Sequence, residues 1–156
     1  MLRELSIAFG IMVLCLATHL TGMVVMADKL LDYREQIEKR ISPGLTAVLV
    51  FLIFTVLVVL HFAEASVWAV FYKWNGLFPN FETCLYFSLG TYSTIGYGDT
   101  LLPSRWRILG AIEGISGVLL CGLSTAFLLA IINALFKLRM DRLQKSGLRT
   151  PVKNDS

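Results

Sequence analysis

The chain has 156 residues, of which 56% are hydrophobic, and its mean hydropathy is +0.68. This composition excludes a soluble domain of that size and predicts a membrane protein. The net charge of +3 does not call for nucleic acid as a partner, because the basic residues gather beside apolar segments.

Three apolar segments, at residues 5–27, 45–72 and 108–136, are long enough to cross a bilayer. The hydrocarbon core is ~30 Å thick, and roughly 20 helical residues span it. The first segment has a longer apolar run than the central region of a signal peptide. We therefore expect residues 1–27 to be a retained transmembrane helix, and the chain to be an all-α membrane protein with three such helices.

The connection at residues 28–43 has the pattern of an amphipathic helix. Apolar residues recur at helical spacing among its charges, namely Leu30, Tyr33, Ile37 and Ile41. This stripe fits a helix lying along the membrane surface, and it equally fits a solvated helix or loop. Ser42 and Pro43 then predict the N-cap and the first turn of the second transmembrane helix.

The remainder of the chain divides into a pore domain at 44–136 and a basic tail at 137–156. Within the pore domain we expect an outer helix, a pore helix, an extended filter and an inner helix, at residues 44–73, 81–93, 94–99 and 105–136. Pro79 and Asn80 signal the start of the pore helix, which is too short to cross the bilayer and must be re-entrant. Non-helical backbone after it is tolerated at membrane depth only where protein buries it or where it lines water. This arrangement predicts an ion pore.

The segment after the pore helix has the residue types that a cation filter needs. A K⁺ ion loses its water shell only where other oxygens replace it, and rings of backbone carbonyls do so. Gly96 and Gly98 can take the backbone angles that turn successive carbonyls inward. Ile95 and Tyr97 can brace the strand against the pore helix, and Thr94 can add its hydroxyl. One strand supplies only part of each ring, so four identical subunits are expected around the axis.

The sequence Thr94-Ile95-Gly96-Tyr97-Gly98-Asp99 resembles the selectivity filter of the K⁺ channel superfamily, with Ile at the second place. The resemblance covers about residues 45–136. It implies a homotetramer that needs no cofactor and conducts K⁺ through the oxygens of residues 94–98. It also implies that Asp99 lies at the outer mouth and that Gly117 is the gating hinge of the inner helix.

Two carboxyl groups, Glu64 and Glu113, lie inside apolar helices at similar depth, and such residues are functional candidates. We expect one or both behind the filter, bonded to pore-helix hydroxyls such as Thr91 or Ser93, in a filter-support or gating role. The alternative is a purely structural pairing with local partners. His61 is one turn before Glu64 and is a candidate partner for it, whereas His19 stands alone in the first segment.

Small residues recur on one face of the last helix, at Gly110, Gly114, Gly117, Cys121 and Ser124. Such a face permits close packing against another helix or a mobile pore lining. We expect packing for most of these positions.

The charges predict the orientation of the chain in a plasma membrane. Basic residues follow the last apolar segment and fill the 28–43 connection, which places both in the cytoplasm and the N-terminus outside. They are Lys137, Arg139, Arg142, Lys145, Arg149 and Lys153 after the last segment, and Lys29, Arg34, Lys39 and Arg40 in the connection. The aromatic residues Trp68, Tyr72, Trp74 and Trp106 are expected to form a belt at the outer boundary, in contact with lipid.

Other functions are less well supported by the sequence. None of the three segments has arginine at every third position, so we expect a voltage-independent channel. An enzyme is not expected, because no spaced nucleophile and base, metal-ligand cluster or phosphate-binding loop stands out. The alternatives are a weakly selective cation channel, which the intact Gly-Tyr-Gly-Asp disfavours, and a non-conducting subunit that modulates another channel or transporter.

Overall fold

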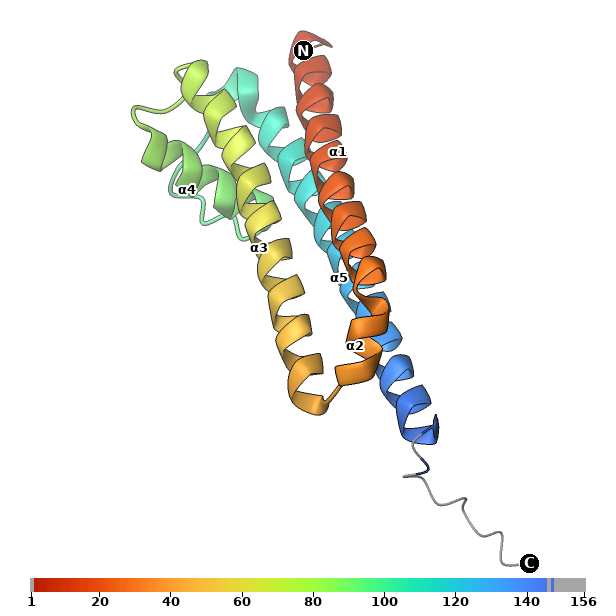
Figure 1. The fold of residues 1–156 in the computed structure, drawn as a ribbon. Coiled ribbons are helices and arrows are strands. Elements are labelled where there is room, and N and C mark those ends of the chain that lie inside the picture. Colours follow the sequence, from red (N-terminus) through yellow and green to blue (C-terminus); the bar gives the residue numbers. More distant parts are fainter. Residues whose placement is uncertain (1, 146, 148–156) are drawn as a thin grey trace, which may run out of the picture.

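The structure, a computed structural model, describes residues 2–145 and residue 147, and every regular element in these residues is helical (Figure 1). The elements in chain order are α1 (Leu2–Asp32), α2 (Arg34–Arg40), α3 (Pro43–Trp74), α4 (Phe81–Tyr92), the 3₁₀ helix η1 (Ser104–Trp106) and α5 (Arg107–Lys145). By length and composition, α1, α3 and α5 can each cross a membrane. The predicted all-α membrane fold with three spanning helices is therefore confirmed.

The three long helices run side by side, and α4 lies across the end of this bundle where α3 finishes and α5 begins (Figure 1). We call this the filter end. The opposite end, which we call the α2 end, holds the short α2 between α1 and α3. Because α4 packs on both α3 and α5, those two helices position the chain segment that follows it.

Both predicted helix starts in the pore domain are confirmed. The Ser42 side chain accepts a hydrogen bond of 3.2 Å from the Leu45 backbone N–H, with Pro43 in the first turn of α3. The Asn80 side chain accepts one of 2.8 Å from the Thr83 N–H at the start of α4. These caps fix where the outer helix leaves the α2 end and where the half-length helix enters the bundle.

The main core lies at the filter end, where α1, α3, α4 and α5 meet. Trp68 and Tyr72 are fully buried there, so the prediction that they belong to an interfacial aromatic belt is wrong. Both side chains fill the space between α3 and its neighbours. Trp74, on the last turn of α3, is 88% exposed and is the residue of this group that fits an interfacial position.

Two boundaries differ from those expected. The first helix continues to Asp32, and only residues 34–40 form a separate helix in the connection, with Ile41 buried directly after it. The last helix continues to Lys145, so the first part of the predicted tail is helical. The expected tail residues Arg149 and Lys153 lie outside the described residues.

Charged contacts tie α1 and α2 to later parts of the chain at both ends of the bundle. Arg105 in η1 holds Glu4 of α1 with its Nε and Nη2 atoms, each 2.8 Å from the Glu4 Oε1 atom. At the α2 end, Lys145 Nζ lies 2.7 Å from Glu38 Oε1. The Lys145 ammonium lowers the pKa of Glu38, which favours its ionised form.

Candidate functional site

The extended segment that follows α4 folds back along this helix. The Thr94 backbone N–H donates to the Thr91 carbonyl at 3.0 Å, and the Gly96 N–H donates to the Gly90 carbonyl at the same distance. The end of α4 thus anchors the first half of the segment. The rest runs past α4 toward η1, which leads into α5.

The backbone of this segment takes left-handed angles at alternate residues. The φ angles are +60° at Thr94, +54° at Gly96 and +76° at Gly98. A Cβ built on either glycine would meet no other atom within 4 Å, so glycine is needed for the backbone conformation rather than for space. The same angle at Thr94 is strained, because its side chain is branched at Cβ.

Aromatic stacking supports the second half of the segment. The Tyr97 ring stacks on Tyr86 of α4, with centroids 6.0 Å apart and 9° between the planes, and the Tyr86 hydroxyl donates to Asp99 at 2.8 Å. Nevertheless, Ile95 is 58% and Tyr97 66% exposed, and all residues from Ser93 to Asp99 are exposed. The chain's own core therefore does not cover the segment, although α4 holds it in place.

Glu113 is fully buried beneath α4 and connects three helices. Its Oε2 atom accepts a hydrogen bond of 2.6 Å from the Tyr72 hydroxyl of α3, and its Oε1 atom contacts the Ser88 hydroxyl of α4. The expected position against the pore helix is found, but the partner hydroxyl is Ser88 rather than Thr91 or Ser93.

The protonation state of Glu113 follows from the hydrogens that are available. The Ser88 hydroxyl also lies 2.6 Å from the Ala65 carbonyl, which can only accept. Ser88 has one hydroxyl hydrogen, and giving it to Ala65 leaves none for Glu113. Both contacts are satisfied when Glu113 is a neutral carboxylic acid that donates to Ser88 and accepts from Tyr72.

Glu64 is also buried and occupies a second polar cluster. Its Oε2 atom accepts from the Tyr92 hydroxyl at the end of α4, and its Oε1 atom lies 2.7 Å from His19 Nδ1. The predicted partner His61 has its Nδ1 atom 3.4 Å from Oε2 and 2.9 Å from the Tyr92 oxygen. His61 therefore belongs to the cluster, but His19 is the closer histidine.

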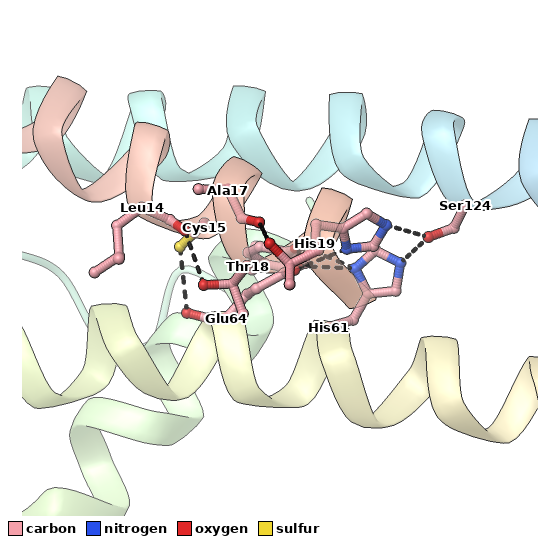
Figure 2. A network of polar contacts seen from close by, with 10 residues as sticks. Leu14, Cys15, Ala17, Thr18, His19, His61, Glu64 and Ser124 are labelled. Atoms are coloured by element: carbon pink, nitrogen blue, oxygen red, sulfur yellow. Dashed lines mark hydrogen bonds and ion pairs between the residues drawn. The ribbon is translucent and has the colours of Figure 1, made fainter. Parts of the chain in front are cut away.

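His19 is the residue that the sequence analysis missed. It is fully buried and meets Glu64 from another helix, 45 positions away in the chain (Figure 2). No short motif could reveal this pair. The available signal was a lone histidine within a long apolar helix, which a buried partner usually has to satisfy.

The small face of α5 packs against α4, as expected for most of its residues. A Cβ on Gly114 would stand 3.4 Å from the Thr91 carbonyl oxygen, and one on Gly117 would stand only 2.0 Å from that of Tyr92. The close packing of α5 on α4 therefore requires glycine at position 117. The hinge role of Gly117 stays a prediction. Cys121 is exposed, and Ser124 joins the histidine cluster.

The fold and the site together define a multi-pass membrane protein with a half-length helix and an extended segment held between two spanning helices. Residues 46–134 match a family model described as "Ion channel". The match covers more than half of the chain, which therefore belongs to this family of ion channels. The matched region runs from the first turn of α3 into the last third of α5 and does not include α1 or α2. Neither the comparison with curated proteins nor that with solved structures gave a match.

Proposed function

We propose that the chain is one subunit of a homotetrameric, voltage-independent channel that conducts K⁺ passively across the plasma membrane. The observation that carries the proposal is the segment 94–98, which follows α4 with left-handed glycines at 96 and 98. Its backbone carbonyls, with the Thr94 hydroxyl, supply the oxygens that replace the hydration shell of K⁺. Asp99 stands at the outer mouth.

The exposure of the filter supports assembly around an axis. One chain contributes one such segment, whereas an ion in a filter needs oxygens on every side. Ile95 and Tyr97 keep large exposed apolar areas in the single chain, which neighbouring subunits would cover. Many exposed apolar residues on α3 and α5 are available for the same neighbours and for lipid.

The dipole of α4 supports cation conduction. The helix ends at Tyr92, next to the filter, and its last carbonyls carry a partial negative charge. In a tetramer, four such ends face the central cavity and favour a cation there. The strength of this effect depends on low dielectric, which the surrounding apolar helices supply.

The charge distribution supports an orientation with the α2 end in the cytoplasm and the N-terminus outside. Basic residues on the end of α1, on α2 and on the end of α5 gather at the α2 end (Figure 1). They are Lys29, Arg34, Lys39, Arg40, Lys137, Arg139, Arg142 and Lys145. The positive-inside rule places such an end in the cytoplasm.

The proposal is tested by K⁺ and Na⁺ flux through the purified protein in liposomes. Gly96→Ala is the test variant and Gly76→Ala its matched control. Both glycines have positive φ, +54° and +64°, and neither has another atom within 4 Å of a built Cβ. The two substitutions therefore carry similar backbone strain, but Gly76 lies in the loop between α3 and α4.

We expect K⁺ flux that Na⁺ does not support, its loss in Gly96→Ala and its retention in Gly76→Ala. Equal K⁺ and Na⁺ flux would instead identify a weakly selective cation channel. A folded tetramer without flux under any ionic condition would favour the modulatory-subunit alternative.

A further inference from the structure

Five polar side chains from four helices meet inside the bundle, and we call them the histidine cluster. They are His19 of α1, His61 and Glu64 of α3, Tyr92 of α4 and Ser124 of α5. Figure 2 shows His19, His61 and Glu64 converging between α1 and α3, with Ser124 approaching the two rings from α5. So many polar groups among apolar helices mark a functional candidate.

The cluster contains the ligand atoms of a metal site. One atom each from His19, His61 and Glu64 lies within 4.8 Å of the other two. Zinc bonds of about 2.0–2.1 Å in a tetrahedron place ligand atoms about 3.3 Å apart. The distances to the Glu64 carboxylate are 3.4 Å from His61 Nδ1 and 2.7 Å from His19 Nδ1. The contact between His19 and Glu64 is shorter than this spacing, so the cluster must open there to admit the ion.

Tyr92 stands where a fourth ligand is needed. Its hydroxyl contacts both Glu64 Oε2 and His61 Nδ1, the latter at 2.9 Å. Two imidazoles and one carboxylate are a set that proteins use for zinc, with the fourth position left to another oxygen. The His61 side chain is 20% exposed and Glu64 only 1%, so His61 lies nearer the surface of the single chain.

Counting hydrogens shows what the metal-free cluster requires. If Glu64 is ionised, His19 Nδ1 must donate to it, and Tyr92 also donates to it. His61 Nδ1 must then donate to the Tyr92 oxygen. Ser124 Oγ lies 2.8 Å from His19 Nε2 and 2.9 Å from His61 Nε2. Ser124 has one hydroxyl hydrogen, so it can donate to only one of the two Nε2 atoms.

A metal ion removes this competition of two imidazole nitrogens for the single hydroxyl hydrogen of Ser124. When the two Nδ1 atoms bind the metal, both rings are neutral and carry their hydrogen on Nε2. Both N–H groups can then donate to the two lone pairs of Ser124 Oγ, and each distance already fits a hydrogen bond. Metal-bound histidines in proteins generally donate their other N–H in this way.

We propose that His19, His61 and Glu64 form a binding site for a divalent transition metal of the zinc class. The Tyr92 hydroxyl completes the coordination, and Ser124 holds both imidazole rings. The bound ion joins α1 to α3 and reaches α4 and α5 through Tyr92 and Ser124. Imidazole ligands favour Zn²⁺, Cu²⁺ and Ni²⁺ over Mg²⁺ and Ca²⁺. The proposal does not depend on which ion the pore conducts.

The test is equilibrium dialysis of the full chain, purified without a polyhistidine tag, stripped with a chelator and held in detergent micelles. Every sample carries Cys121→Ser, because an exposed thiol such as that of Cys121 can bind zinc by itself. We expect one Zn²⁺ per chain in the presence of excess Mg²⁺. Co²⁺ in place of Zn²⁺ should give the visible absorption of tetrahedral nitrogen and oxygen coordination.

The variants separate ligands from supporting residues. His19→Gln and His61→Gln each remove a ligand and should abolish the one-per-chain binding. Ser124→Ala keeps the three ligands and should weaken Zn²⁺ binding by about 10–100-fold, the usual effect of losing such a partner. Glu82→Gln alters an exposed carboxylate on α4 and should bind as the parent does.

Three results would overturn the proposal. They are the absence of Zn²⁺ from the folded parent chain, unchanged binding in both histidine variants, and unchanged affinity in Ser124→Ala. The last comparison decides the question alone if the histidine variants do not fold. None of these measurements uses ion flux, so failure of the metal site leaves the proposed K⁺ conduction untouched.

Discussion

The backbone carbonyl of Tyr92 packs closely against Gly117, and a Cβ at position 117 would lie only 2.0 Å from the Tyr92 oxygen. Tyr92 is the last residue of α4, and the filter begins two positions later. The inner helix therefore touches the backbone that leads into the filter. A shift of α5 at this point must move the end of α4 or break the contact, because packed groups deform little.

Gly117→Ala should consequently destabilise the protein and disturb the filter. Overpacking costs about 1–3 kcal/mol and occasionally more, and the clash here is with backbone that cannot rotate away. Gly122→Ala on the same helix is the control, because its Cβ would meet nothing within 4 Å of the chain. Alanine there should favour the helix by about 1 kcal/mol. The measurements are the thermal stability of the purified protein and the ratio of K⁺ to Na⁺ flux in liposomes.

If Gly117→Ala keeps its stability and changes only the open time of the channel, the hinge is the better account of this glycine. Loss of stability together with altered selectivity supports the packing contact with Tyr92. Equal behaviour of the variants at 117 and 122 would contradict the close approach seen between α5 and α4.

If Glu113 is neutral, the protein should keep its stability when glutamine replaces this residue. In Glu113→Gln the amide N–H donates to Ser88 and the carbonyl accepts from Tyr72, so both contacts survive. Glu113→Ala leaves two buried hydroxyl groups without this partner. Each group left unsatisfied lowers the free energy of unfolding by about 1–3 kcal/mol. We expect a melting temperature near the parent's for the glutamine variant and a clear drop for alanine.

This comparison also tests the hydrogen count directly. A glutamine variant as unstable as the alanine variant would contradict the assignment, because it would mean that an amide cannot replace the carboxyl group between Ser88 and Tyr72.

Much of the fold could be predicted from the sequence because bilayer thickness and local capping determine it. The lengths of the apolar runs gave three spanning helices, and Ser42 and Asn80 gave two helix starts. The end of α5 was missed for a related reason. An apolar run marks where the bilayer ends, whereas residues up to Lys145 still favour a helix.

The pairings between helices could not be predicted, because α3 is apolar on nearly all sides. A helix without a distinct polar face does not reveal its rotation from sequence. Trp68 and Tyr72 fit an interface as well as a core, and only their burial separates the two. The segment proposed as the filter could be singled out because its glycines and its place after a short helix form a local pattern. Apart from His61, which lies one turn from Glu64 on α3, the partners of Glu64 and Glu113 come from other helices and have no such pattern.

The contact between Glu38 and Lys145 predicts a pH-dependent attachment of α2 to α5. Lys145 lowers the pKa of Glu38, so the contact contributes fully above the ordinary carboxylate pKa of about 4.3. This contribution is lost as the pH falls through the lower, folded-state pKa. Relative to the intrinsic exchange rate at the same pH, the amides of residues 34–40 should therefore exchange slowly at neutral pH and faster in acid.

Glu38→Gln should give the faster exchange already at neutral pH, because the ion pair is gone. High salt should have a similar effect on the parent, since the Lys145 side chain is 74% exposed and screening is effective there. Glu35→Gln, which changes an exposed acid on the same helix, is the control. A faster exchange in the control as large as in Glu38→Gln would show that helix charge alone is responsible.

Tyr86 should control the outer half of the filter through two separable contacts. Its ring stacks on Tyr97, and its hydroxyl donates to Asp99 at 2.8 Å. Tyr86→Phe keeps the stacking and removes the hydrogen bond, whereas Tyr86→Ala removes both. We expect K⁺ flux in liposomes to decline faster over time in the phenylalanine variant, with selectivity kept, and selectivity to fall in the alanine variant.

Asp99→Asn still offers an oxygen to the Tyr86 hydroxyl, so its flux should decline more slowly than that of Tyr86→Phe. The same rapid decline in both would mean that the charge at the mouth, rather than the link to α4, stabilises the conducting filter.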